Sequence, residues 1–195
     1  MFKQWQGFIR TIQRYWKNYG GIKAILTSPY FHISIILTIL TLPFWWIEKW
    51  WDNSLSIIPN ILGFTLGGFA IFLGYGNDKF RSLMACEDEK GYSPYMEVVS
   101  SFLHFVIIQI CSIIISLIAK SLDMMPNMIK TINKDCTCYI IITKLTAALG
   151  YTVFLYSILL AFATSFALYR LASIYSQFET MEHKNQSNNT NNTKE

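Results

Sequence analysis

Four long stretches of the chain carry no Asp, Glu, Lys or Arg, and they constrain its fold more than any other feature of the sequence. They cover residues 31–47, 57–76, 98–119 and 145–169 and hold 17, 20, 22 and 25 residues. A helix needs about 20 apolar residues to cross a hydrocarbon layer about 30 Å thick. Because 52% of the residues are hydrophobic and only 14% are charged, the sequence predicts an all-α integral membrane protein with four transmembrane helices.

The segments outside these stretches predict the domain organisation. Residues 1–30 are expected to form an amphipathic interfacial segment, and residues 31–176 a four-helix transmembrane domain. Residues 184–195 are rich in Asn and Thr, so we expect a polar, disordered tail. The pieces between the stretches are too short to bury a core of their own. A separate soluble catalytic domain is therefore not expected.

The distribution of basic residues predicts how the chain is oriented. Five Lys or Arg residues precede the first stretch, and with both termini on one side that side carries eleven, against four on the other. Basic residues concentrate in cytoplasmic loops, so we expect both termini in the cytoplasm. Four of the six tryptophans fall between Trp45 and Trp51. We expect these indoles to mark the outer membrane surface.

The first 19 residues predict an amphipathic helix, because their aromatic and basic side chains separate onto opposite sides at 100° per residue. Gly20 and Gly21 are expected to end it. Such a helix lies among lipid headgroups, with its basic face toward anionic lipid. Two roles stay open, a topology anchor or a sensor of lipid packing and membrane disturbance. The expected membrane-surface residues are Lys3, Trp5, Arg10, Arg14, Trp16 and Lys17.

Small residues form a stripe along the second stretch. Gly63, Gly67, Ala70 and Gly74 follow the spacing i, i+4, i+7, i+11 and so share one helix face. Pro59 is expected in the first turn of this helix, where a missing backbone N–H costs little. Small residues let helix backbones approach closely in lipid. We expect a tight helix contact, within the subunit or between subunits of a homo-oligomer such as a tetramer; a pore-lining or gating role is the alternative.

The third stretch carries several polar side chains, and one helix face holds Glu97, Ser101, His104, Ser112 and Ser116. We single out Ser101, His104, Gln109 and Ser112. Polar groups inside a membrane face protein or water. One interpretation is bonding to another span, and the other is a face that lines an ion or proton pathway, with His104 able to titrate near neutral pH. Charged residues are absent from the middle of every stretch, which argues against a charged proton relay.

No arrangement of residues in the sequence predicts catalysis or metal binding. His32, His104 and His183 fall in different segments, and Cys136 and Cys138 alone supply too few ligands for zinc. We therefore expect no enzyme, no cofactor and no metal, and we expect no direct binding of nucleic acid. The expected partners are the lipid bilayer, further copies of the chain and a soluble cytoplasmic protein.

Two segments face the cytoplasm in the predicted orientation and could dock the soluble partner. They are residues 77–96 and residues 170–184. The first has mixed charge, which suits a polar docking surface. Its candidate docking residues are Lys79, Arg81, Glu87, Asp88, Glu89 and Tyr92.

The layout resembles the KwaA family, the membrane subunits of the bacterial Kiwa anti-phage defence system. The resemblance rests on the short four-span chain, the basic segment from Phe2 to Lys23, and the segment IPNILGFTLGGFAIFLGYGNDKF from Ile57 to Phe80. It implies a homo-oligomer of the bacterial inner membrane that senses phage-related disturbance of the envelope. It also implies a soluble cytoplasmic partner, KwaB, that acts on phage DNA.

These observations lead to one expected function and two alternatives. We expect a non-enzymatic membrane sensor and scaffold that forms a homo-oligomer and recruits a cytoplasmic partner in anti-phage defence. The first alternative is a pore-forming or ion-channel-like oligomer that permeabilises the membrane. The second is an accessory subunit of a larger transporter.

Overall fold

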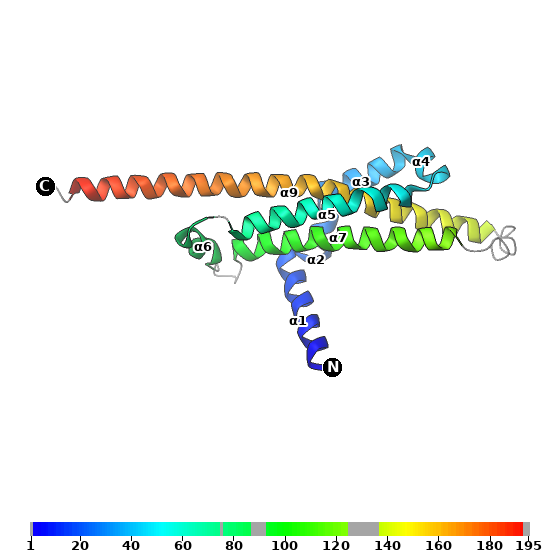
Figure 1. Ribbon diagram of the computed structural model, residues 1–195, viewed down its shortest axis with the longest axis horizontal. Coiled ribbons are helices and arrows are strands. Elements are labelled where there is room, and N and C mark those ends of the chain that lie inside the picture. Colours follow the sequence, from blue (N-terminus) through cyan, green and yellow to red (C-terminus); the bar gives the residue numbers. More distant parts are fainter. Residues whose placement is uncertain (1, 75, 87–92, 125–136, 193–195) are drawn as a thin grey trace.

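The computed structural model describes residues 2–74, 76–86, 93–124 and 137–192, and each element in these ranges is an α-helix (Figure 1). The helices are α1 (Phe2–Tyr19), α2 (Gly21–Leu26), α3 (Pro29–Leu40), α4 (Leu42–Ile47), α5 (Trp50–Gly74), α6 (Asp78–Ala85), α7 (Pro94–Asp123) and α9 (Thr137–Asn192).

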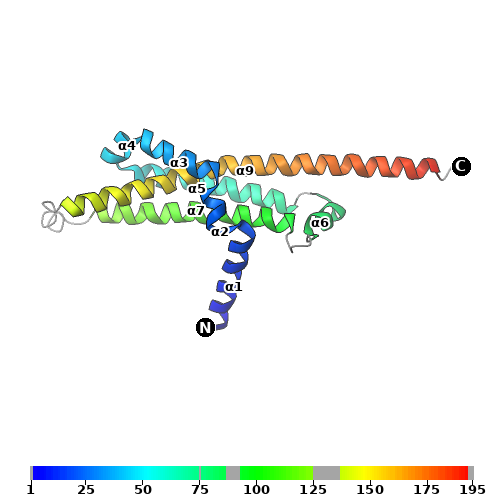
Figure 2. The ribbon, with the colours of Figure 1, turned by 180° about the vertical axis from the view of Figure 1, so that it is seen from behind.

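Helices α5, α7 and α9 form the body of the molecule. They lie side by side, while α3 packs against α9 and α1 projects away from the body (Figures 1 and 2). Three helical segments are long and apolar enough to cross a membrane, Trp50–Gly74, Pro94–Asp123 and Ile141–Lys184, and Pro29–Leu40 is apolar but shorter. The all-helical prediction is confirmed. The structure supplies three candidate membrane-spanning helices where the sequence predicted four.

The first predicted span is divided into two helices. Helix α3 ends at Leu40, and α4 begins at Leu42 with Pro43 in its first turn. Proline has no N–H to donate to the preceding turn, and its ring clashes with the carbonyl of that turn. Thr41 lies at the break, where its hydroxyl donates to the Leu37 carbonyl at 2.7 Å. The predicted span over residues 31–47 is therefore divided between two helices.

Helix α5 begins seven residues before the predicted start at residue 57, with Trp50 as its first residue. Pro59 consequently lies inside the helix and not in its first turn. The extra residues are held by packing, because Trp50, Ser54 and Ile58 are buried against the other helices. From the local preference of Pro59, the helix was expected to start near this residue. Tertiary contacts extend it to Trp50 instead.

The final helix, α9, continues to Asn192. The sequence predicted a disordered tail from residue 184, so that prediction differs from the structure over residues 184–192; residues 193–195 lie outside the described part. Asn and Thr are weak helix formers. An established helix nevertheless adds one hydrogen bond per residue without a new nucleation step, which accounts for the continuation.

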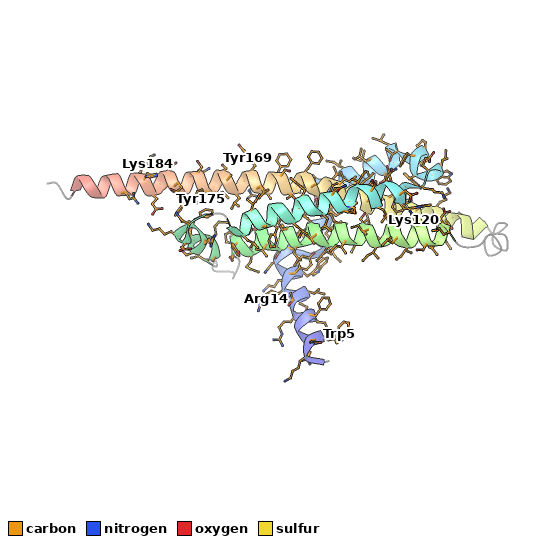
Figure 3. All side chains as sticks on the ribbon, viewed as in Figure 1. Trp5, Arg14, Lys120, Tyr169, Tyr175 and Lys184 are labelled. Atoms are coloured by element: carbon orange, nitrogen blue, oxygen red, sulfur yellow. The ribbon has the colours of Figure 1, made fainter. Side chains whose placement is uncertain are left out.

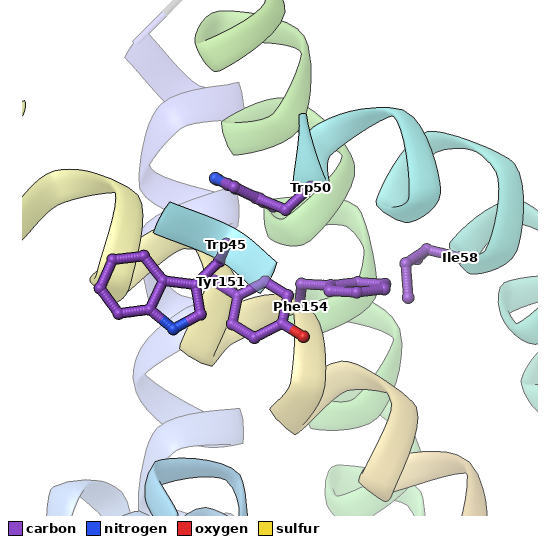
Figure 4. Packing of buried hydrophobic residues seen from close by; sticks show 5 residues of the cluster. All are labelled: Trp45, Trp50, Ile58, Tyr151 and Phe154. Atoms are coloured by element: carbon purple, nitrogen blue, oxygen red, sulfur yellow. The ribbon is translucent and has the colours of Figure 1, made fainter. Parts of the chain in front are cut away.

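One cluster of the apolar core lies at one end of the helical body. Indole, phenyl and aliphatic side chains from α4, α5 and α9 pack together there (Figure 4). Two of the tryptophans expected at the membrane surface are therefore buried inside the bundle. The buried members of this cluster are Trp45, Trp50, Ile58, Tyr151 and Phe154.

Charged side chains gather at the same end of the body. Lys120 of α7 donates to the Asp52 carboxylate at 2.8 Å, and Lys49 pairs with Asp123 at 2.9 Å. Lys144 of α9 donates to the Trp46 carbonyl at 2.6 Å. These contacts place charged groups of α5, α7 and α9 close together at this end of the body, where Figure 3 labels Lys120.

Candidate functional site

The predicted amphipathic helix is present as α1, and most of it touches no other helix. Side chains from Lys3 to Arg14 are exposed, and α1 points away from the body (Figure 3). On its apolar face Trp5 is 62% exposed and Phe8 is 58% exposed. The basic residues Lys3, Arg10, Arg14 and Lys17 are exposed as well. Both faces of this helix are therefore free to meet the surroundings.

The last turn of α1 is the part that contacts the body. Tyr15 is buried, and its hydroxyl lies 2.8 Å from Nδ1 of His104 in α7. The ring of Tyr19 stacks on the same imidazole, with centroids 3.9 Å apart and planes 18° apart. Burial raises the pKa of the Tyr15 hydroxyl to about 12. The phenol is therefore protonated at neutral pH and can share a hydrogen bond with the imidazole.

A third helix completes this contact through Tyr156 of α9. Its hydroxyl lies 3.4 Å from Nε2 of His104, and the imidazole is only 1% exposed. A neutral imidazole donates from one nitrogen and accepts at the other, and a phenol can do either. Each nitrogen of His104 thus has a phenol partner. The imidazole joins α1, α7 and α9 at one point.

Two glycines set the direction of α1 relative to α2. Gly20 has φ 96° and Gly21 has φ 64°, which other residues rarely adopt. A Cβ on Gly20 would lie 3.2 Å from the Ala24 side chain. The predicted end of the first helix at these glycines is confirmed. The chain changes direction here between α1 and α2 and continues through α2 to α3 (Figures 1 and 2).

If α7 crosses a membrane, with one edge of the apolar layer at Lys120, the position of His104 along α7 would place the α1 contact near the other edge. A helix rises about 1.5 Å per residue. A layer about 30 Å thick would therefore end about 20 residues before Lys120, near Ser100. Helix α1 would leave the body at this level, roughly one turn inside that edge.

The other polar side chains of α7 face α5. Gln109 donates to the Thr65 hydroxyl at 2.9 Å, and Ser116 donates to the Ser54 hydroxyl at 2.7 Å. Ser112 lies 3.3 Å from the same Ser54 oxygen. All of these side chains are buried inside the chain. The exception among the predicted residues is Ser101, whose hydroxyl donates to the Glu97 carbonyl of its own helix at 3.0 Å.

The predicted glycine stripe faces outward. Gly63, Gly67, Ala70 and Gly74 are exposed, and a Cβ on any of the three glycines would have no neighbour within 4 Å. A contact within the chain forms instead at Gly68, where a Cβ would lie 3.2 Å from Leu168. Sequence reasoning missed Gly68 because a small-residue spacing does not show which face meets a neighbour. The stripe therefore does not form a helix contact within the subunit. A contact between subunits was the other possibility for this stripe.

Two of the predicted docking residues lie on α6. Lys79 forms an ion pair with Glu182 of α9, and Arg81 donates to the Gly74 carbonyl at 3.2 Å. Helix α6 is held against α9 by Phe80, whose ring meets Tyr175 edge-on at 5.0 Å. An open groove of about 510 Å³ runs between α6 and α9. The other candidates, Glu87, Asp88, Glu89 and Tyr92, lie outside the described residues.

Histidine, cysteine and carboxylate side chains do not converge in the described part of the chain, where no three of them could hold a metal ion. Of the cysteine pair, Cys136 lies outside the described residues. Comparisons with protein-family models, with characterised proteins and with solved structures found no match for this chain. The features that bear on function are therefore the exposed helix α1 and its contact with His104.

Proposed function

We propose that the protein is a non-enzymatic membrane sensor and scaffold whose helix α1 lies on the inner surface of the bilayer. The observation that carries this proposal is the exposure of both faces of α1 where it leaves the body. Exposed Trp5 and Phe8 are unfavourable in water and favourable in the headgroup region. Basic residues on the other face would each add about 1 kcal/mol of attraction to anionic lipid.

A fourth crossing of the membrane completes the proposed topology. Helices α3 and α4 together run from Pro29 to Ile47, which is close to the length that a thin apolar layer requires. The outward side chains of α3 are aliphatic, as lipid contact requires: Ile36 is 55% exposed and Leu40 is 70% exposed. Four crossings bring both termini to the cytoplasmic side of the bacterial inner membrane, in agreement with the excess of basic residues there.

Self-association is the second part of the proposal. The exposed stripe of Gly63, Gly67, Ala70 and Gly74 would let α5 of a second copy approach closely. A ring of copies, such as a tetramer, would gather the cytoplasmic ends of α9 and the α6 segments. A soluble partner would dock there, which agrees with the resemblance to the Kiwa membrane subunits and their partner KwaB. The chain itself would not bind nucleic acid.

The pore alternative receives less support from the contacts. Gln109 and Ser112 would have to face a channel, and both are buried against α5 of the same chain. The Gln109 Nε2 and the Ser112 hydroxyl already have partners inside the chain and gain little by turning to a pore. An accessory subunit of a transporter would instead co-purify with another integral membrane protein.

Charge reversal on α1 tests the sensor proposal. The variant Arg10→Glu, Arg14→Glu, Lys17→Glu should lose contact with anionic lipid, because repulsion replaces attraction. Reconstituted protein is examined for quenching of tryptophan fluorescence by brominated phosphatidylglycerol, and a variant lacking Trp5 and Trp16 gives the background from the other indoles. Phage protection is then compared at equal expression.

A conservative variant provides the matched control. Arg10→Lys and Arg14→Lys keep the charge of α1, so quenching and protection should stay as in the native protein. Unchanged protection in the charge-reversed protein would overturn the sensing role. Unchanged quenching would overturn the placement of α1 on the lipid surface.

A further inference from the structure

We propose that α1 is a hinged arm held on the body by a latch of three side chains, Tyr15, His104 and Tyr156, and that release of the latch transmits events at the membrane surface to α9. The inference rests on the proposed function, because it says how a helix on the lipid surface reaches the cytoplasmic end of the protein. The contact that has to open is the one between Tyr15 and His104.

The latch attaches the long helix α1 to the body through a small number of side chains. Helix α1 has 18 residues, yet the side chains from Lys3 to Arg14 are exposed and the buried member of the helix is Tyr15. The attachment is made by phenol and imidazole groups at 2.8 Å and 3.4 Å, with Tyr19 stacked on His104. A force on the free part of the arm therefore acts on these few contacts.

The hinge lies directly after the latch. Gly20 separates α1 from α2 and Gly21 begins α2, and both glycines have positive φ angles. Glycine crosses between backbone regions more readily than other residues. The arm can consequently change its direction while α2 and α3 keep their positions.

The polar groups of the latch would find other partners in the released state. Tyr15 and Tyr19 lose the imidazole contact on release, but tyrosine is favoured at a membrane–water interface. In the proposed topology His104 lies near the edge of the apolar layer, where water can replace the phenol hydroxyls. Apolar side chains in place of these groups would gain no hydrogen bonds to water on release. A change in lipid packing at the arm can therefore shift the balance between the two states.

The latch is connected to the cytoplasmic end through a single helix. Tyr156 belongs to α9, which continues without interruption to Asn192. Farther along, α9 packs on α6 through Leu171, Tyr175 and Phe178. Loss of the Tyr156 contact would thus remove one interaction from the helix that carries the proposed partner-docking segment.

Distance measurements between spin labels test the latch. In a protein whose four native cysteines are replaced by serine, labels are placed at Gln6→Cys on the arm and Gln177→Cys on α9. The full chain is examined in nanodiscs of phosphatidylethanolamine and phosphatidylglycerol. We expect one narrow distance distribution for the native latch. Tyr15→Phe should broaden it and raise the released population about tenfold, because a buried imidazole nitrogen loses its partner.

Two further variants make the result specific. Tyr169→Phe removes an exposed hydroxyl from α9 outside the latch and should leave the distribution narrow. Tyr15→Phe combined with Tyr156→Phe should be non-additive, since both hydroxyls bond the same imidazole. A second label pair, Met96→Cys and Gln177→Cys, shows that the body is folded when it reports an unchanged α7–α9 distance in Tyr15→Phe.

The outcomes separate the latch from the sensor proposal. A narrow distribution in Tyr15→Phe, or equal broadening in Tyr169→Phe, would overturn the latch. If Tyr15→Phe releases the arm while the charge-reversed arm is still quenched by brominated lipid, the latch stands and the basic face is not what holds the arm to lipid. If charge reversal abolishes quenching and Tyr15→Phe has no effect, the lipid contact stands without a latch.

Discussion

The indole of Trp50 lies directly over the backbone of Gly150, so that a Cβ on this glycine would come within 2.7 Å of Trp50 Cη2. Ile115 Cγ2 would lie 3.1 Å from the same Cβ. Gly150 is buried in α9, Trp50 begins α5, and Ile115 belongs to α7. The absence of a side chain at this position is what allows the three helices to close around the aromatic core (Figure 4).

Substitution of Gly150 by alanine should destabilise the folded protein. Overpacking a filled core costs about 1–3 kcal/mol, which exceeds the roughly 1 kcal/mol that alanine gains over glycine in a helix. Thermal unfolding in detergent, followed by circular dichroism, measures the difference. Gly7→Ala is the control, because a Cβ there meets nothing within 4 Å. The packing account fails if both variants unfold at the same temperature as the native protein.

A bulky residue in the exposed glycine stripe should weaken self-association without harming the fold. In Gly67→Leu the new side chain points away from the other helices of the chain but would separate two α5 helices in contact. Mass measurement of the detergent-solubilised protein should show a shift toward monomer. Ile71→Leu, also exposed on α5, keeps the side-chain volume and should leave the mass unchanged. An oligomer that persists in Gly67→Leu would exclude this face as the interface.

Alkaline pH should release α1 from the body. Burial raises the pKa of Tyr15 to about 12 from 10.0, and it also raises the pKa of Tyr19. The docked state therefore holds its phenol protons more tightly than the released state. Docking should be constant below pH 10 and should weaken as the pH rises toward 12. The Gln6–Gln177 label distance reports this change, and release that is complete below pH 9 would contradict the burial of Tyr15.

The buried amide of Gln109 gives a prediction about the pore alternative. Among the residues that the structure describes, its Oε1 has no hydrogen-bond partner, while its Nε2 donates to Thr65. Thr65→Val should cost about 1–3 kcal/mol, because it leaves the amide with no partner at all. Gln109→Leu removes the unpaired oxygen and should cost less, although both variants break the same hydrogen bond. Thermal unfolding ranks them, and planar-bilayer recording should show no conductance that depends on Gln109.

The amino-acid sequence by itself determined the features that depend on near neighbours along the chain. The bounds of α1 follow from its 3.6-residue pattern and from Gly20 and Gly21, and the structure has them at Phe2 and Tyr19. The long apolar stretches likewise predicted helices, because their length and lack of charge are local properties. The position of Pro59 inside α5, instead of in its first turn, was not predicted, since buried contacts outweigh the local preference of proline.

Only the tertiary structure decided which faces meet. Gly67 and Gly68 are adjacent and chemically identical, yet Gly68 is packed and Gly67 is open. His104 finds its partners 89 residues away at Tyr15 and 52 residues away at Tyr156. Periodicity shows that such side chains share a face, but the partner depends on the rotation and depth at which separate helices pack. Those two quantities come from the fit of many side chains at once, and no single segment contains them.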